Sequence, residues 1–247
     1  MPRLSQKIGV YQEYLPHLSV DCVVFGFNEN GLKVLLLKMK HREEWALPGG
    51  FVGQDETVEA AATRVLQERT GLEQVFLQQF HVFSDPNRSE GNSASSGDKQ
   101  AAAWLNQRFI TLGFYALVPF DKVKPQPDAI SEACTWWDVE AVGSLLIDHN
   151  LILKKALEAM RLQLRYQPLG LNLLPAKFTM PQLQKLYEII LGQTLDRRNF
   201  QRKMMDYGIL HRLEERKTGV AHKAPYYYKF NKQRYKQALK EGLEGGW

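Results

Sequence analysis

The most informative segment of the chain is residues 50–72, which read GFVGQDETVEAAATRVLQERTGL. Pro48 and Gly49 precede it, so three residues that interrupt helices and strands stand in a row at its start. From residue 57 to residue 69 apolar side chains recur at helical spacing, and Gly71 occupies the position of a helix C-cap. The segment therefore predicts a glycine-rich loop followed by one helix.

Strand-like segments surround this loop and helix. Residues 20–27 are apolar and β-branched, an Asn/Gly turn follows, and residues 32–37 are again apolar, which predicts a hairpin. Further elements are expected as strands at 75–83, 109–118 and 134–139 and as a helix at 147–164. The Ser-, Gly- and Asn-rich residues 85–99 predict a surface loop. Such a pattern is typical of an α+β or sandwich arrangement.

The second part of the chain has a different pattern. An apolar stripe at helical spacing begins after Thr179, a suitable N-cap, and Gly192 interrupts it. Asp196 is a suitable cap for a second helix over residues 197–207. Two helices joined by a short turn that contains glycine predict a helix-turn-helix.

A predicted hairpin follows the two helices. Its strands are residues 209–215 and 226–230, and a polar turn joins them. Helix, turn, helix and hairpin together predict a winged helix. We therefore expect two domains, residues 1–165 and residues 166–247.

Charge is divided unevenly between the two parts. The 247 residues carry a net charge of +5. Residues 1–150 contain 13 Lys and Arg against 19 Asp and Glu, a net charge of −6. Residues 151–247 contain 19 Lys and Arg against 8 Asp and Glu, a net charge of +11. A basic second part favours a phosphate-bearing partner such as nucleic acid.

The second predicted helix and the hairpin supply candidate contacts with double-stranded DNA. In a helix-turn-helix the first residues of the second helix reach the bases, where each bidentate Arg or Asn contact contributes roughly 1–3 kcal/mol of discrimination. The candidates are Arg197, Arg198, Asn199, Arg202 and Lys203 on the helix, and Arg216, Lys217 and Lys223 at the hairpin. A solvated basic surface and nonspecific nucleic-acid binding are the alternatives, but the agreement of helices, hairpin and charge favours a specific operator.

Residues 50–72 resemble the Nudix box. The matching residues are Gly50, Glu56 six positions on, Arg64 eight positions further, and the closing Gly71. The resemblance implies an α/β/α sandwich around a mixed sheet, in which the box forms a loop-helix-loop. It also implies a relation to enzymes that hydrolyse nucleoside diphosphates linked to another group. We therefore expect an α+β chain, with a Nudix sandwich followed by a winged helix-turn-helix domain.

The box departs from the family pattern at its carboxylates. Of three expected after Arg64, Val65 and Arg69 replace two, and Glu68 alone is retained. Pyrophosphate cleavage needs Mg²⁺, which takes several oxygen ligands. The sequence therefore predicts no catalytic residue, no metal site and no cofactor. The alternative is an active hydrolase of a nucleoside diphosphate derivative, with Mg²⁺ as its cofactor.

The whole chain, from about residue 20 to residue 230, resembles the Nudix-related transcriptional regulators of bacteria. Residues 172–175, 183–187 and 197–200 fall where such proteins join and build their winged helix. The resemblance implies a homodimer in which a small effector binds the Nudix domain and weakens operator binding. The resemblance further implies that the effector is either a nucleotide related to ADP-ribose and NAD or a sugar such as L-arabinose. The sequence around Asp21 is similar to the arabinose and sugar-catabolism regulators of Bacteroidetes.

Candidate effector contacts combine the box with nearby aromatic and acidic residues. They are Asp21, Trp45, Phe51, Glu56, Arg64 and Glu68. Core packing is the alternative role for the two aromatic residues, and a structural Glu–Arg pair is the alternative for Glu56 and Arg64.

The compartment follows from what the sequence lacks. Two cysteines, Cys22 and Cys134, make neither a disulfide framework nor a zinc site. Residues 1–19 contain no apolar stretch of signal-peptide length, and no run of 18 apolar residues could span a membrane. We therefore expect a cytoplasmic protein with no membrane partner.

Overall fold

The computed structural model describes residues 13–28, 31–40, 42–73, 75–89, 103–127, 130–219 and 224–243. The chain forms two compact units. The first comprises residues 1–25, 34–116 and 122–156, and the second comprises residues 26–33, 117–121 and 157–247. The division thus falls inside a helix at residue 156, and the predicted domain boundary at residue 165 stays a prediction.

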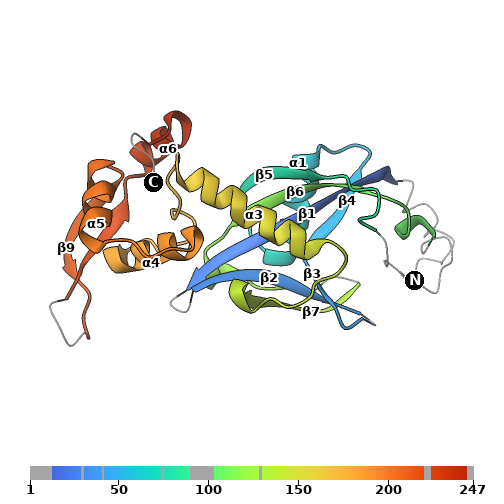
Figure 1. The fold of residues 1–247 in the computed structure, drawn as a ribbon, viewed down its shortest axis with the longest axis horizontal. Coiled ribbons are helices and arrows are strands. Elements are labelled where there is room, and N and C mark those ends of the chain that lie inside the picture. Colours follow the sequence, from blue (N-terminus) through green and yellow to red (C-terminus); the bar gives the residue numbers. More distant parts are fainter. Residues whose placement is uncertain are drawn as a thin grey trace. The chain divides into compact units, whose positions relative to one another are not determined.

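A seven-stranded sheet organises the first unit, and some of its strands continue into the short segments of the second (Figure 1). Its strands are β1 (Tyr14–Asn28), β2 (Gly31–Met39), β3 (Trp45–Ala46), β4 (Gly49–Gly53), β5 (Phe76–Phe83), β6 (Ile110–Leu117) and β7 (Ser131–Asp138). The order is β3-β2-β1-β6-β5, with β4 paired to β1 and β7 paired to β2. The predicted strands are all confirmed.

Helix α1 (Val58–Thr70) contacts β4 and corresponds to the predicted helix of the box. Thr57 caps its N-terminus by accepting a hydrogen bond from Ala60 N at 3.2 Å. Gly71 ends it with φ of 70°, a left-handed conformation that glycine adopts without strain. The antiparallel pairing of β1 with β4 places Asp21 opposite Gly49 and Ser19 opposite Phe51. The box is therefore attached to the centre of the sheet.

Three short or shared elements complete the first part of the chain. They are the 3₁₀ turns η3 (Phe120–Lys122) and η4 (Val139–Ala141) and the helix α3 (His149–Leu164). Helix α3 corresponds to the helix expected at 147–164. None of the described helices has both the length and the hydropathy that crossing a bilayer requires.

The second unit contains the predicted helix-turn-helix and hairpin. Its elements are β8 (Phe178–Thr179), α4 (Met180–Leu191), α5 (Arg197–Asp206), β9 (Leu210–Arg216), β10 (Tyr226–Phe230) and α6 (Lys232–Glu241). Strand β10 lies between β8 and β9. The rings of Tyr187 and Phe200, both buried, meet at 5.4 Å and join α4 to α5. Helix α6 has no counterpart among the elements expected from the sequence.

The turn between α4 and α5 is held by side chains of α4. Gly192 adopts φ of 69°, and the Glu188 carboxylate accepts a hydrogen bond from Leu195 N at 2.8 Å. The Asp196 carboxylate then caps α5 by accepting from Asn199 N at 2.9 Å. These contacts fix the angle at which the second helix leaves the first.

Candidate effector site and DNA-binding surface

The Glu56–Arg64 pair is the centre of the box. Arg64 Nη2 donates to Glu56 Oε1 at 2.7 Å and to the carbonyl oxygen of Phe51 at 2.9 Å. Gly53 N donates to the same Glu56 oxygen at 2.7 Å. The hydrogen bond from Arg64 is the main reason why the pKa of Glu56 lies below its usual range. The pair therefore holds β4 against α1, and it leaves the Glu56 carboxylate engaged.

The carboxylates of the box do not suit a metal ion. Glu68 lies 3.8 Å from Arg64 Nη1 and 3.7 Å from Arg69 Nη1, so two cations compete for its charge. Val65, at the position of an expected carboxylate, is buried with 1% of its surface exposed. Within the described part of the chain, no group of three His, Cys, Asp or Glu side chains is placed to hold a metal. Mg²⁺ does not fit the residues present here.

Aromatic rings lie beside the box. The Phe51 ring is 4.3 Å from that of Trp104, 5.7 Å from that of Tyr14 and 5.1 Å from that of Phe109, between ring centroids. We call Tyr14, Phe51, Trp104 and Phe109 the aromatic cluster. Phe51, Tyr14 and Trp104 are half-buried. Only Phe51 was among the predicted contacts, because Tyr14 and Trp104 are distant from the box in sequence.

Trp45 lies in a different aromatic pair. Its ring meets that of Trp137 edge to face at 5.2 Å. Strand β3, which carries Trp45, pairs with β2 through Lys38 and Leu37. The contacts of Trp45 therefore do not include the aromatic cluster, and its role as an effector contact stays a prediction.

Asp21 belongs to a buried group of charged side chains. Arg88 donates to the Asp148 carboxylate from Nε at 2.8 Å and from Nη2 at 2.9 Å. Asp21 Oδ2 lies 3.5 Å from Arg88 Nη2, and Asp21 Oδ1 lies 3.8 Å from His149 Nε2. We call these four residues the buried charge cluster. A Cβ atom at residue 49 would overlap the Asp21 carboxylate, so a larger residue there would displace Asp21 from its partners.

His149 is held in its neutral form in this cluster. Its Nδ1 accepts a hydrogen bond from Leu47 N at 2.9 Å, which leaves the proton on Nε2, toward Asp21. Burial lowers the pKa of the ring, against the opposing effect of Asp21. The Asp21 carboxylate thus faces internal partners, and its role as an effector contact stays a prediction. Asp148 and His149 were not predicted, because nothing in the sequence brings them to Asp21.

The six predicted effector contacts therefore separate into three places. Phe51, Glu56, Arg64 and Glu68 are linked by the contacts of the box. Asp21 faces Arg88 and His149, and Trp45 faces Trp137.

In the second unit, helix α5 presents the predicted base-reading side chains to solvent. Arg197, Arg198, Asn199 and Arg202 are exposed, and Arg202 Nη2 donates to Asn199 Oδ1 at 3.2 Å. Lys203 is half-buried, and this burial lowers its pKa. The first turn of α5 thus has the composition and exposure that major-groove contacts require.

At the base of the hairpin, the Arg216 side chain makes contacts within the hairpin, whereas Lys217 is held there through its backbone. The Arg216 guanidinium stacks on the Tyr226 ring at 3.8 Å and donates to the carbonyl oxygen of Ala224 at 3.2 Å. Lys217 N donates to the carbonyl oxygen of Pro225 at 3.0 Å, which closes the hairpin. Lys223 lies outside the described residues.

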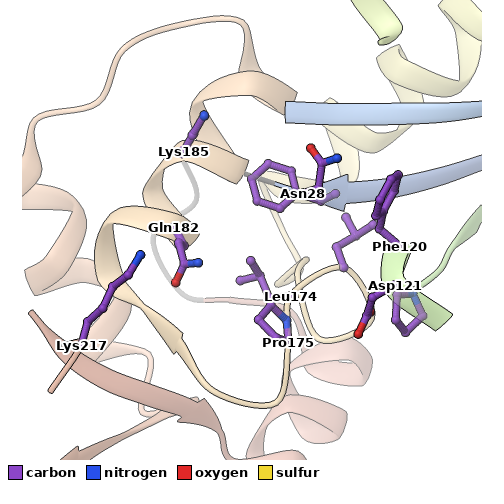
Figure 2. A pocket seen from close by; sticks show the side chains of 11 residues that line it. Asn28, Phe120, Asp121, Leu174, Pro175, Gln182, Lys185 and Lys217 are labelled. Carbon is purple, nitrogen blue, oxygen red and sulfur yellow. The ribbon is translucent and has the colours of Figure 1, made fainter. Parts of the chain in front are cut away.

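The Lys217 side chain also lines a cavity of the second unit. Figure 2 shows Lys217 with Gln182 and Lys185 of α4 on one wall and Phe120 and Asn28 on another. The cavity volume is about 460 Å³, within the range of small-molecule sites. Lys217 thus contributes to a cavity wall, and its role as a phosphate contact stays a prediction.

Known families match both units. The NUDIX domain family matches residues 15–160, and the NrtR DNA-binding winged helix domain matches residues 170–230. The chain is 32% identical over 228 residues to the ADPR responsive transcriptional repressor NtrR of Acinetobacter baylyi, covering 89% of this chain and 84% of the relative. It is 30% identical over 154 residues to the ADP-ribose pyrophosphatase of Methanocaldococcus jannaschii, covering 61% of this chain and 79% of that enzyme.

Solved structures show the same fold. Shewanella oneidensis NrtR superposes with a TM-score of 0.73 at 23% identity, covering 94% of this chain and 100% of that chain. The structure of the same protein complexed with a 27mer DNA gives a TM-score of 0.73 at 22% identity, covering 93% of this chain and 99% of that chain. These matches confirm the expected fold class, a Nudix domain followed by a winged helix. They give no support to a sugar effector or to the expected likeness to Bacteroidetes regulators. The chain belongs to the Nudix-related transcriptional regulators, in which a Nudix domain is joined to an NrtR-type DNA-binding winged helix.

Proposed function

We propose that this chain is a transcriptional regulator whose Nudix unit binds ADP-ribose and whose winged helix binds an operator. The observation that carries the proposal is the match over 89% of the chain to an ADPR responsive repressor, because it includes the effector unit and the DNA-binding unit together. The second relative, an ADP-ribose pyrophosphatase, matches the Nudix part and favours the same small molecule.

The side chains around the box suit the chemistry of ADP-ribose. Its two phosphates are anionic, and the Arg64 guanidinium has 37% of its side-chain surface exposed while Glu56 fixes its position. Its adenine offers an aromatic face, and the half-buried rings of Tyr14 and Trp104 lie next to Phe51, whose carbonyl oxygen binds Arg64. We therefore assign the nucleotide to the surface formed by Arg64 and the aromatic cluster.

Binding without hydrolysis is the expected activity of this unit. Glu56 is paired with Arg64, and Glu68 lies between two arginines, so neither offers a free carboxylate to Mg²⁺. Release of AMP from ADP-ribose in the presence of Mg²⁺, at ordinary enzymatic turnover, would instead support the hydrolase alternative.

The DNA-binding unit acts through α5 in this proposal. The exposed side chains of Arg197, Arg198 and Asn199 are placed on the first turn of the second helix, which reaches base edges in the major groove. We infer a homodimer acting in the cytoplasm, in which ADP-ribose binding changes the spacing of the two winged helices and weakens operator binding. A coupling of roughly 1–3 kcal/mol between the two sites is typical of such regulation.

The experiment that tests the proposal measures both ligands. In a thermal unfolding series, ADP-ribose at 100 times its dissociation constant should stabilise the chain by about 2.7 kcal/mol, whereas L-arabinose should leave the midpoint unchanged. Gel-shift titrations should show that the chain binds its own promoter more tightly than a random duplex. ADP-ribose should weaken the binding to the promoter. Equal affinity for both duplexes, or no response to ADP-ribose, would contradict the proposal. Sedimentation equilibrium tests the dimer.

A further inference from the structure

Helix α6 carries a row of lysines along one face. Lys232, Lys236 and Lys240 are four residues apart, so their side chains stand above one another on the helix surface. All three are exposed. Among the described residues, no carboxylate forms an ion pair with any of them. We call these three residues the lysine row.

Helix stability accounts for only part of the lysine row, because Lys240 alone lies in the last turn, where the helix dipole favours a cation. Like charges four residues apart destabilise a helix, and the row contains two such pairs. Lys232 also lies in the first turn, where the helix dipole disfavours a cation. The contacts that stabilise α6 come from other residues, namely the Asn231 cap on Arg234 N and the buried ring of Tyr235. An anionic partner outside the helix would relieve the repulsion between these exposed lysines.

The contacts of α6 hold the row in a fixed position on the DNA-binding unit. At its N-terminal end, Asn231 N donates to the carbonyl oxygen of Ile209, just after α5. In its middle, Tyr235 Oη donates to the carbonyl oxygen of Pro168 at 2.8 Å. At its C-terminal end, Leu243 N donates to the carbonyl oxygen of Tyr166 at 2.6 Å. The lysines therefore share a preorganised backbone, which lowers the entropy lost when they bind a rigid partner.

We propose that the lysine row contacts the phosphate backbone of the operator duplex, next to the segment that α5 reads. This inference rests on the proposed function, because it takes DNA as the partner. Eight residues of helix separate Lys232 from Lys240, a rise of about 12 Å. One strand of a duplex presents a phosphate about every 3.4 Å along its axis, so the row spans three to four phosphates. The family match to the winged helix ends at residue 230, so it does not include α6.

The test compares two triple variants of the full-length chain. One replaces the lysine row, as Lys232→Gln, Lys236→Gln and Lys240→Gln, which keeps helix propensity nearly unchanged. The control removes the same charge from exposed lysines of the first unit, as Lys122→Gln, Lys124→Gln and Lys154→Gln. Circular dichroism and the thermal midpoint verify that both variants fold as the parent does.

The measurement is the affinity for a fluorescein-labelled random-sequence duplex, determined by fluorescence anisotropy at a series of salt concentrations. Each phosphate contact contributes about 0.9 to the slope of log affinity against log salt concentration, so the row variant should lower the slope by about 2 to 3. Its preference for the promoter over random duplex should not change, because phosphates carry no sequence information. The control variant should keep the parent slope.

Each outcome has a distinct meaning. A row variant with the same slope as the control would overturn the inference while leaving the proposed function intact. A parent chain that binds neither duplex at low salt would overturn both. Loss of promoter preference in the row variant, with an unchanged slope, would assign the row to base reading and contradict a backbone contact.

Discussion

Arg88 is the residue whose replacement should most disturb the Nudix unit. Its side chain is 3% exposed and lies against the carboxylates of Asp148 and Asp21, whose side chains are 15% and 11% exposed. The Arg88→Met variant would leave those two charges buried without their cation, and it would also remove the donor to the Phe109 carbonyl oxygen. Breaking a buried ion pair in this way destabilises a protein by about 3–5 kcal/mol. For a unit of this size, that corresponds to a drop of roughly 6–20 °C in the unfolding midpoint.

Urea unfolding, monitored by tryptophan fluorescence, measures this change, because four of the five tryptophans lie in the first unit, namely Trp45, Trp104, Trp136 and Trp137. Arg108→Met is a suitable control, since the Arg108 side chain is exposed and, among the described residues, donates to the carbonyl oxygen of Ser84 alone. The control should change the free energy of unfolding by less than about 1 kcal/mol. Equal losses in the free energy of unfolding for Arg88→Met and Arg108→Met would refute the reasoning, because Arg88 would then not stabilise the buried carboxylates.

Three further changes test other parts of the structure. Arg198→Ala should reduce the preference for promoter over random duplex by about 1–3 kcal/mol in competition gel shifts. Lys217→Gln should weaken binding to both duplexes equally and lower the slope of log affinity against log salt concentration by about 0.9. An unchanged slope would assign the Lys217 side chain to the cavity wall alone. Because burial lowers the pKa of His149, the folded chain resists protonation of this ring. The neutral ring therefore contributes its full stability above the ordinary histidine pKa of about 6.5. That contribution is lost as the pH falls through the lower pKa of the folded state. His149→Gln should therefore lose less stability than the parent between about pH 7.5 and pH 5.5 in urea titrations, and an equal loss would contradict the neutral ring. Glu56→Ala should reduce ADP-ribose affinity at least tenfold in calorimetry, since Arg64 would lose the partner that positions it, and unchanged affinity would remove Arg64 from the site.

Local sequence was sufficient for the elements that hydrogen bonds and periodicity define over short distances. Gly71 marks the C-terminal end of α1 in the sequence as it does in the structure, where it adopts a left-handed conformation. Asp196 likewise identifies the start of α5. Because these signals lie within one or two helical turns of the residues that they control, no tertiary contact is needed to read them.

Sequence spacing also anticipated the Glu56–Arg64 pair and the missing carboxylates. These residues lie on one loop and one helix, so their separation along the chain determines their separation in space. Val65 and Arg69 stand in the sequence itself where the family pattern has two acidic residues. The structure added that Arg69 and Arg64 both approach Glu68, which strengthens the case against a metal.

What sequence alone determined about this protein is the resemblance of its first part to the Nudix pattern, with Val65 and Arg69 in place of two expected carboxylates, and of its basic second part to a winged helix. Only the tertiary structure decided which distant charges meet: Arg88 reaches Asp148 across 60 positions of chain, and it reaches Asp21 across a still longer separation. Such contacts depend on how strands pair and where a helix begins, and no periodicity in the chain encodes them. The same holds for the lysine row, whose spacing is visible in the sequence but whose rigid attachment to the DNA-binding unit arises from contacts with Pro168 and Ile209.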